Sequence, residues 1–313
     1  MNYGNLVRRP FEIMARRPYL WLLAALAGGA TTFNLSGSSY GRPAGSRGGY
    51  HGPGWAAIQN LWNDNFGLIV GILAFFLVVG IVLFILGCIA TGGIIRAAIE
   101  HDAEREYKLG TAWRAGYASG WRIAGLRLLT ILLAIVPGLL VGALVVAAVA
   151  GASASTAAAV AFGLSAGIAF LVSLVFWLAL GVAYQFAQRL VVLEGGQVAA
   201  SLSHGFRMIR WHFGPVALSW LLLIAVSIGV GIAMAVLAVV VAVPAITLGL
   251  GGFFLGGPIG GVVLGTFAAV FFIGVLVAAG AAYSAYSSIY WTLMYKNLRE
   301  LPEPSARGAI APA

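Results

Sequence analysis

Long uncharged runs alternate with short basic segments along this chain. The longest runs without a charged residue are Gly67 to Ile95, Leu128 to Gln188 and His212 to Tyr295. Each exceeds the roughly 20 apolar residues that cross a bilayer core as a helix, and the last two are long enough to cross it twice. The pattern therefore predicts an all-α, polytopic integral membrane protein.

A search with a window of about 19 residues, the length used to find membrane helices, gives six spans. They are approximately 19–33, 67–95, 128–150, 157–186, 216–243 and 262–291. The first span is short and follows four arginines, so a cleaved signal peptide is the alternative to a retained signal anchor. We expect retention, because no clear small-x-small cleavage site precedes a mature domain. The sequence thus predicts a six-helix bundle as one membrane domain over 1–295, with a short tail at 296–313.

Basic residues fall almost entirely on one side of these spans. Of the 18 Lys and Arg residues, 16 lie on one side, and only Arg42 and Arg47 lie in the first loop on the other side. Positive residues mark the cytoplasmic side, so both termini are predicted to be cytoplasmic in a cell membrane. The loop 34–54 is rich in Gly, Ser and Pro, and we expect it to be a disordered outer loop.

Composition agrees with a membrane protein and explains the charge. The chain is 61% hydrophobic and 9% charged, against about 25% charged residues in ordinary soluble domains. The net charge of +9 is explained by basic loops that hold the orientation and meet anionic headgroups. Membrane lipids are therefore expected partners, and nucleic acid is not.

The basic segments before the spans resemble one another. At a constant offset of 89 residues, Gly116 aligns with Gly205 and Gly125 aligns with Gly214. The N-terminal "RRPFEIMARRPYLWLL" runs into its span as "RMIRWHFGPVALSWLL" does. We therefore expect three units, each made of a cytoplasmic amphipathic helix followed by a two-span hairpin.

Aromatic stripes mark the predicted cytoplasmic helices. Bulky apolar residues recur every three or four positions while arginines point elsewhere, which suits a helix in the headgroup plane. A helix packed beneath the bundle as a collar is a compatible alternative. The residues predicted to contact the membrane or a protein partner are Trp113, Tyr117, Trp121, Phe206, Ile209 and Phe213.

One short segment holds much of the acidic charge. Four of the nine acidic residues lie within seven positions, beside His101: Glu100, Asp102, Glu104 and Glu106. Carboxylates beside a histidine could bind a metal or perform acid–base catalysis. We expect one helix from Gly67 to about Tyr107, with Glu100 and Glu104 on one face. A dinuclear site would need a second acidic helix, which the sequence lacks, so we favour a solvated helix end and expect no catalytic residue, metal or cofactor.

A second polar stripe closes the last span. Tyr283, Tyr286 and Tyr290 recur at i, i+3 and i+7. They could line a cavity or bind a lipid headgroup. The alternative is interhelical packing together with the aromatic belt at the membrane surface.

Three segments carry a resemblance to known proteins. They are "GGIIRAAIEHDAEREYKLGTAWRAGYASGWRIAGLRLL", "RLVVLEGGQVAASLSHGFRMIRWHFGPVALSWLLL" and "AYSAYSSIYWTLMYKNLRE". The chain resembles uncharacterised prokaryotic six-span membrane proteins, which are similar to the membrane domain of some glycerophosphodiester phosphodiesterases. The resemblance implies a six-helix bundle and no catalytic residue.

Three functions remain open at this point. The first is a non-enzymatic membrane scaffold or accessory subunit that acts through lipid and protein contacts, with a protein partner or a second copy of itself. It is favoured because the predicted spans lack the intramembrane charges that usually mark ion or proton pathways. The alternatives are a permease or channel for a neutral or lipidic substrate, and a lipid-modifying enzyme that uses Asp102, Glu104 and Glu106.

Overall fold

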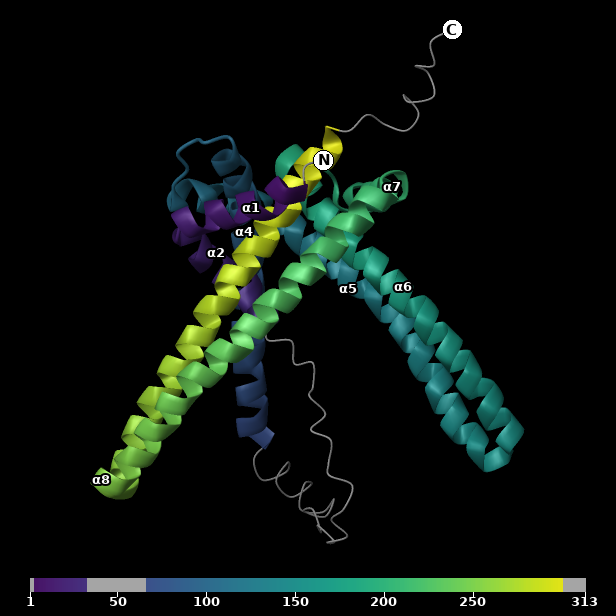
Figure 1. Ribbon diagram of the computed structural model, residues 1–313. Coiled ribbons are helices and arrows are strands. Elements are labelled where there is room, and N and C mark those ends of the chain that lie inside the picture. Colours follow the sequence, from purple (N-terminus) through teal and green to yellow (C-terminus); the bar gives the residue numbers. More distant parts are fainter. Residues whose placement is uncertain (1–2, 33–65, 301–313) are drawn as a thin grey trace.

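The computed structural model describes residues 3–32 and 66–300 (Figure 1). These residues form helices and no strand, which confirms the all-α prediction. The predicted outer loop 34–54 and most of the predicted tail lie outside the described residues. The helices are α1 (Tyr3–Arg16), α2 (Tyr19–Thr32), α4 (Phe66–Asp102), α5 (Leu109–Ala154), α6 (Thr156–Glu194), α7 (Val198–Trp211) and α8 (Phe213–Arg299).

Two of the connections between long helices are very tight. The Ser155 side chain accepts a hydrogen bond from Ala158 N at 3.1 Å and so caps the start of α6 directly after α5. Helix α8 reverses at Gly257, whose φ of 64° is a conformation that residues with a Cβ rarely adopt. The helices α5 and α6 form one hairpin, and the two halves of α8, before and after Gly257, form another (Figure 1).

Five helices are long and apolar enough to cross a membrane. They are Phe66–Asp102, Leu109–Ala152, Thr156–Glu194, Phe213–Phe254 and Gly256–Arg299. The first predicted span coincides with α2, whose apolar part, Tyr19–Gly28, is shorter. The chain is therefore a multi-pass helical membrane protein with five candidate spans among its described residues.

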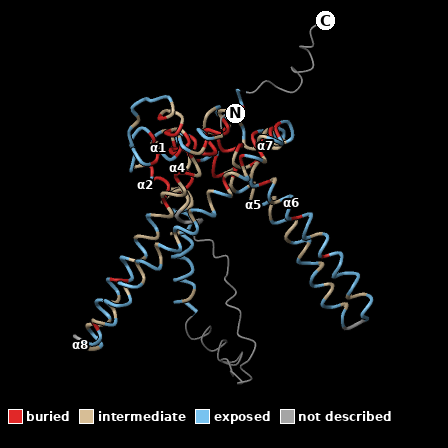
Figure 2. Tube along the Cα trace, viewed as in Figure 1, coloured by how far each residue is buried: buried red, intermediate tan, exposed pale blue. Residues whose placement is uncertain are grey.

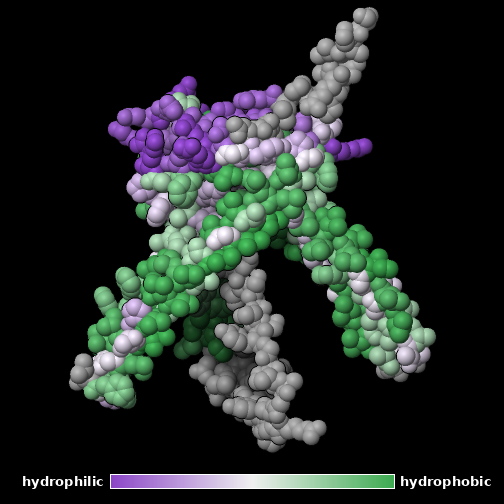
Figure 3. Space-filling view, in the orientation of Figure 1, coloured by the Kyte–Doolittle hydropathy of each residue, from purple (hydrophilic) through white to green (hydrophobic). Residues whose placement is uncertain are grey.

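Burial is concentrated at one end of the molecule (Figure 2). We call this end the cap; it comprises α1, α2, α7 and the ends of the long helices that meet them. The rest of the long helices form arms that diverge from the cap and carry bare apolar side chains, such as Phe76 at 65% and Val149 at 72% exposure. Figure 3 shows the hydrophilic cap above the hydrophobic arms. Exposed apolar area costs roughly 25 cal/mol per Å² in water, so the arms fit a hydrocarbon environment.

The core of the cap joins segments from both ends of the chain. Leu20 and Leu23 of α2 and Ala97 of α4 are fully buried, and they pack in one cluster with Ile289 and Met294 near the end of α8. A second cluster joins α4, α5, α6 and α7. These two clusters thus hold α4, the α5–α6 hairpin and the α8 hairpin together at the cap.

The two glycines aligned by the sequence repeat occupy equivalent positions. A Cβ on Gly116 would lie 2.1 Å from the Ile89 carbonyl oxygen of α4, and one on Gly205 would lie 2.5 Å from the Ala183 carbonyl oxygen of α6. In each case an amphipathic segment packs backbone to backbone on the preceding long helix. In α5 this segment continues into the arm without interruption, whereas α7 and α8 meet at His212.

The predicted helix from Gly67 to about Tyr107 is wrong at its end. Helix α4 stops at Asp102, and Glu104 takes a positive φ of 59°. Glu100 and Glu104 therefore do not share a helical face. A hydrogen bond from Arg105 N to the Glu100 carbonyl oxygen, at 3.0 Å, closes the turn. Arg9 of α1 lies against it and donates to the Asp102 carbonyl oxygen, at 3.4 Å, and to the Glu104 carboxylate, at 3.2 Å.

Candidate functional site

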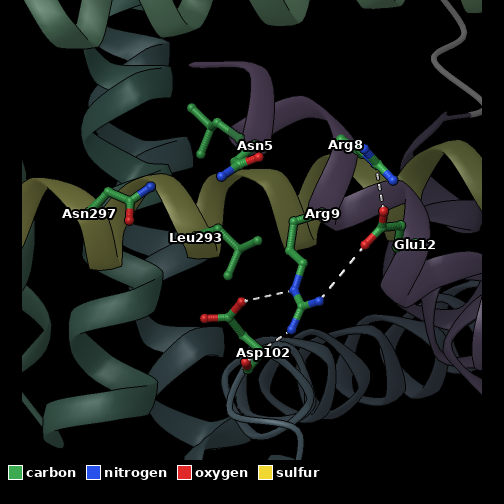
Figure 4. Close-up of a pocket in the computed structure, with 8 residues that line it drawn as sticks. Asn5, Arg8, Arg9, Glu12, Asp102, Leu293 and Asn297 are labelled. Atoms are coloured by element: carbon green, nitrogen blue, oxygen red, sulfur yellow. Dashed lines mark hydrogen bonds and ion pairs between the residues drawn. The ribbon is translucent and has the colours of Figure 1, made fainter. Parts of the chain in front are cut away.

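The acidic segment lies where α1, the end of α4 and the end of α8 meet. Asp102 is its centre (Figure 4). Its Oδ1 lies 3.5 Å from Arg9 Nε, and its Oδ2 lies 2.7 Å from Lys296 Nζ. The Asp102 side chain is only 16% exposed. One carboxylate at the end of α4 thus binds both Arg9 of α1, 93 residues earlier, and Lys296 of α8, 194 residues later in the sequence.

The neighbouring acids are also paired with basic side chains. Glu100 lies 3.4 Å from Arg96 and 3.3 Å from Arg105. The hydrogen bond to Glu104 and the nearby charge of Asp102 raise the pKa of the Arg9 guanidinium, against the opposing effect of its burial. Carboxylates engaged in this way link the helices of the cap to one another.

A pocket of about 460 Å³ opens beside Asp102. Figure 4 shows Arg9 pointing across it towards Asp102 and Glu12, with Leu293 and Asn297 of α8 on the opposite wall. The two acidic residues that line this pocket, Glu12 and Asp102, both form ion pairs with basic side chains. The arrangement can hold a small polar molecule, but it does not present an unoccupied general base.

His101 is directed into the cap and not towards the other acids. It is buried, its Nε2 contacts the Tyr19 hydroxyl, and its ring meets the Tyr107 ring edge to face at 6.4 Å. Burial raises the pKa of the Tyr107 phenol. Over residues 3–32 and 66–300, no three His, Cys, Asp or Glu side chains converge as a metal site would require.

The predicted aromatic stripes divide into exposed and packed residues. Tyr117 is 73% exposed, Trp121 78% and Phe213 68%. The other three pack against the core of the cap: Trp113, Phe206 and Ile209. The helices are therefore packed onto the bundle and still present bare rings, an arrangement compatible with either interpretation. Their role as contacts for lipid or protein stays a prediction.

The tyrosine stripe also divides. Tyr283 and Tyr286 line an apolar groove of about 640 Å³ between α1, α2 and the two arms of α8. The Tyr283 hydroxyl contacts Ser227 Oγ on the opposite arm. Tyr290 is fully buried and donates a hydrogen bond to the Ser219 carbonyl oxygen at 2.7 Å. The first two residues thus lie beside a cavity, and the third joins the two arms.

Sequence reasoning missed the most buried charge of the described chain. It counted Arg189 with the loop after the fourth predicted span, but α6 continues to Glu194 and Arg189 is only 1% exposed. Gln185 and Gln188 could have indicated this buried position, because they place two further polar side chains on the last helical turns before Arg189.

One protein family matches this chain. The family model covers residues 14–297 and describes a family of unknown function, DUF7544. The chain belongs to this family. No curated protein and no solved structure matches. The DUF7544 match includes the arms and most of the cap, but it begins near the end of α1 and leaves out Arg9 and Glu12. The resemblance to glycerophosphodiester phosphodiesterases stays an expectation from the sequence motifs.

Proposed function

We propose that this protein is a non-enzymatic membrane scaffold or accessory subunit that acts through lipid and protein contacts. The observation that carries the proposal is the contrast between the side chains of the cap and those of the arms. Most acidic residues of the cap pair with basic side chains, as Asp102 does with Arg9 and Lys296. The exposed surfaces are apolar arms and the bare rings of Tyr117, Trp121 and Phe213.

The proposed topology has six spans with the cap on the cytoplasmic side. Helix α2 would begin the first span, and both termini would lie in the cytoplasm beside three amphipathic helices. Support comes from the distribution of Lys and Arg, 16 against 2, because basic residues are retained on the cytoplasmic side. The suggested kinship with the membrane domain of the phosphodiesterases belongs to this proposal as well.

The proposal is tested first by native mass spectrometry of the tagged protein, gently extracted from its own membrane. We expect a stoichiometric second protein, a second copy of the chain, or bound lipid. A bare monomer without protein or lipid, recovered repeatedly in mild detergents, would refute the proposal.

The exposed rings give a sharper test. Tyr117→Ala combined with Trp121→Ala removes the two most exposed rings of α5 without opening the core. We expect weaker association with the partner or with liposomes, at unchanged thermal stability. Trp113→Ala is the matched control, because Trp113 packs inside the cap and its loss should lower stability and leave association intact. Unchanged association in the double variant would count against these contacts.

A second candidate function is a permease for a neutral or lipidic substrate. It is favoured by the groove of about 640 Å³ that Tyr283 and Tyr286 line. Flux of a fluorescent lipid in proteoliposomes, abolished by Tyr286→Leu, would support it. A lipid-modifying enzyme is less favoured, because Asp102 and Glu104 are engaged with Arg9.

A further inference from the structure

A polar pocket lies at the point where the arms leave the cap. It measures about 220 Å³ and is lined from α2, α4, α5, α6 and α8. This volume is below the roughly 300 Å³ at which pockets for drug-sized ligands begin, so it suits a small polar group. The polar side chains that could meet such a group include Arg127, Gln185, Gln188, Arg189, Ser284 and Ser287.

Arg189 is buried in this wall without a negative partner. Its Nη1 bonds the Gln185 carbonyl at 2.7 Å and the Gln185 side-chain oxygen at 2.6 Å, and its Nη2 bonds the Ser288 carbonyl at 3.1 Å. These acceptors are all neutral. The buried Nε has no hydrogen-bond partner among the described residues. One donor of a buried cation is therefore left over.

Arg127 adds a second positive charge to the same pocket. Its guanidinium lies over the Phe84 ring, 5.4 Å from the centroid. Within residues 3–32 and 66–300, neither Arg127 nor Arg189 forms an ion pair with a carboxylate, unlike Arg9 in the cap. Burying a charge without a counter-ion costs several kcal/mol. The pocket thus has an excess of positive charge that an anion from outside would offset.

The position of the pocket indicates which anion. Arg127 stands where the α5 arm leaves the cap, and the residues that follow it are bare and apolar, such as Leu128 at 58% and Leu132 at 62% exposure. Figure 3 shows the boundary between the hydrophilic cap and the hydrophobic arms. In a bilayer this boundary coincides with the plane of the lipid headgroups.

We propose that this pocket binds the phosphate of an anionic phospholipid, whose acyl chains then lie along the arms. The inference rests on the proposed function, since it names the lipid class and the site of one lipid contact. Arg127 and Arg189 supply the charge, because guanidinium groups donate paired hydrogen bonds to phosphate oxygens. Ser284 and Ser287 supply neutral donors on α8.

The test uses the full-length protein, delipidated in detergent and titrated with phosphatidylglycerol or phosphatidylcholine. Native mass spectrometry reads the lipid bound, and the melting temperature reports ligand stabilisation. We expect one retained phosphatidylglycerol and about ten- to hundredfold weaker binding in Arg127→Gln, which is the effect of losing charged hydrogen bonds. The matched control is Arg210→Gln, which removes the same charge from an exposed site on α7.

Arg189→Gln should weaken binding equally. If that variant does not fold, Arg127→Gln carries the test, because its side chain is only partly buried. Equal lipid retention in Arg127→Gln and Arg210→Gln would overturn the site while leaving the proposed function intact. No retained lipid or protein partner in any sample would overturn both. Competition by inorganic phosphate as strong as that by phosphatidylglycerol would show a free-phosphate site and overturn the lipid assignment.

Discussion

The glycine contact between α4 and α5 gives the most direct test of how the cap is assembled. In Gly116→Ala, the new methyl group would lie 2.1 Å from the Ile89 carbonyl oxygen and 2.9 Å from Gly93 N. Both atoms belong to the backbone of α4, so no side chain can rotate away. Ordinary contact begins at 3.4 Å, and the two helices must therefore separate by more than about one ångström.

The expected cost follows from two opposing effects. Overpacking a close contact costs about 1–3 kcal/mol, and the rigid backbone on both sides puts Gly116→Ala at the upper end. The gain in helix propensity from Gly to Ala returns about 1 kcal/mol. We therefore expect the free energy of unfolding to fall by about 2 kcal/mol.

The assay is equilibrium unfolding in mixed micelles, followed by circular dichroism and tryptophan fluorescence. The matched control is Gly142→Ala in the same helix, where nothing lies within 4 Å of the new methyl group. This control should be as stable as the parent or slightly more stable. Gly205→Ala should repeat the loss, because its methyl group meets the Ala183 carbonyl at 2.5 Å. If Gly116→Ala and Gly142→Ala unfold alike, the close approach of the two backbones is refuted.

Three further substitutions test other parts of the cap by thermal unfolding in detergent. Asp102→Asn breaks the ion pairs to Arg9 and Lys296, and it should lower the free energy of unfolding by about 2 kcal/mol, since both partners are partly exposed. The control, Glu106→Gln at an exposed position, should change it by less than about 0.5 kcal/mol. Equal effects of the two substitutions would contradict the role of Asp102 in linking α1 and α8. Tyr290→Phe removes the hydrogen bond to the Ser219 carbonyl oxygen and should lower the free energy of unfolding by about 1 kcal/mol. An unchanged stability would mean that this bond does not help to join the α8 arms. Gly195 ends α6 with a φ of 69°. Gly195→Ala places a Cβ in this conformation and should lower the free energy of unfolding by about 1 kcal/mol, whereas Gly195→Asn should lower it less because Asn tolerates a positive φ. The reverse order would argue against the left-handed conformation at the end of α6.

The local features of this fold could be read from the sequence because they depend on short-range patterns. Uncharged runs predicted the long helices, and the repeat picked out Gly116 and Gly205 before their close contacts were known. The end of α4 could not be predicted, because the turn is made by Glu104, a residue type that rarely takes a positive φ, and the side chain that contacts it, Arg9, lies 95 residues earlier in the chain. A local pattern contains no information about such a partner.

The same reasoning explains the mixed outcome at the candidate sites. The tyrosine stripe was found from helical spacing, but only packing decides that Tyr283 faces a cavity while Tyr290 is buried between the arms. Arg189 was assigned to a loop because charge is normally excluded from apolar helices. A buried arginine that breaks this rule is the type of residue whose role depends on a ligand or on tertiary contacts.

The lengths of the arms are related to their divergence. The exposed part of α4, from Phe66 to about Leu86, has roughly 20 residues and spans about 30 Å, the thickness of a bilayer core. The part of α5 without a buried residue, Leu128 to Ala152, has roughly 25 residues and spans about 38 Å. If α4 lies along the bilayer normal, the α5–α6 hairpin must incline by about 40° to stay within the same core, at the upper end of the observed range. Figure 1 shows the α5–α6 and α8 hairpins inclined to opposite sides of α4. Helices of unequal length that are joined at a single cap must therefore diverge within a bilayer. The polar pocket that Arg127 and Arg189 line lies at the point where they separate.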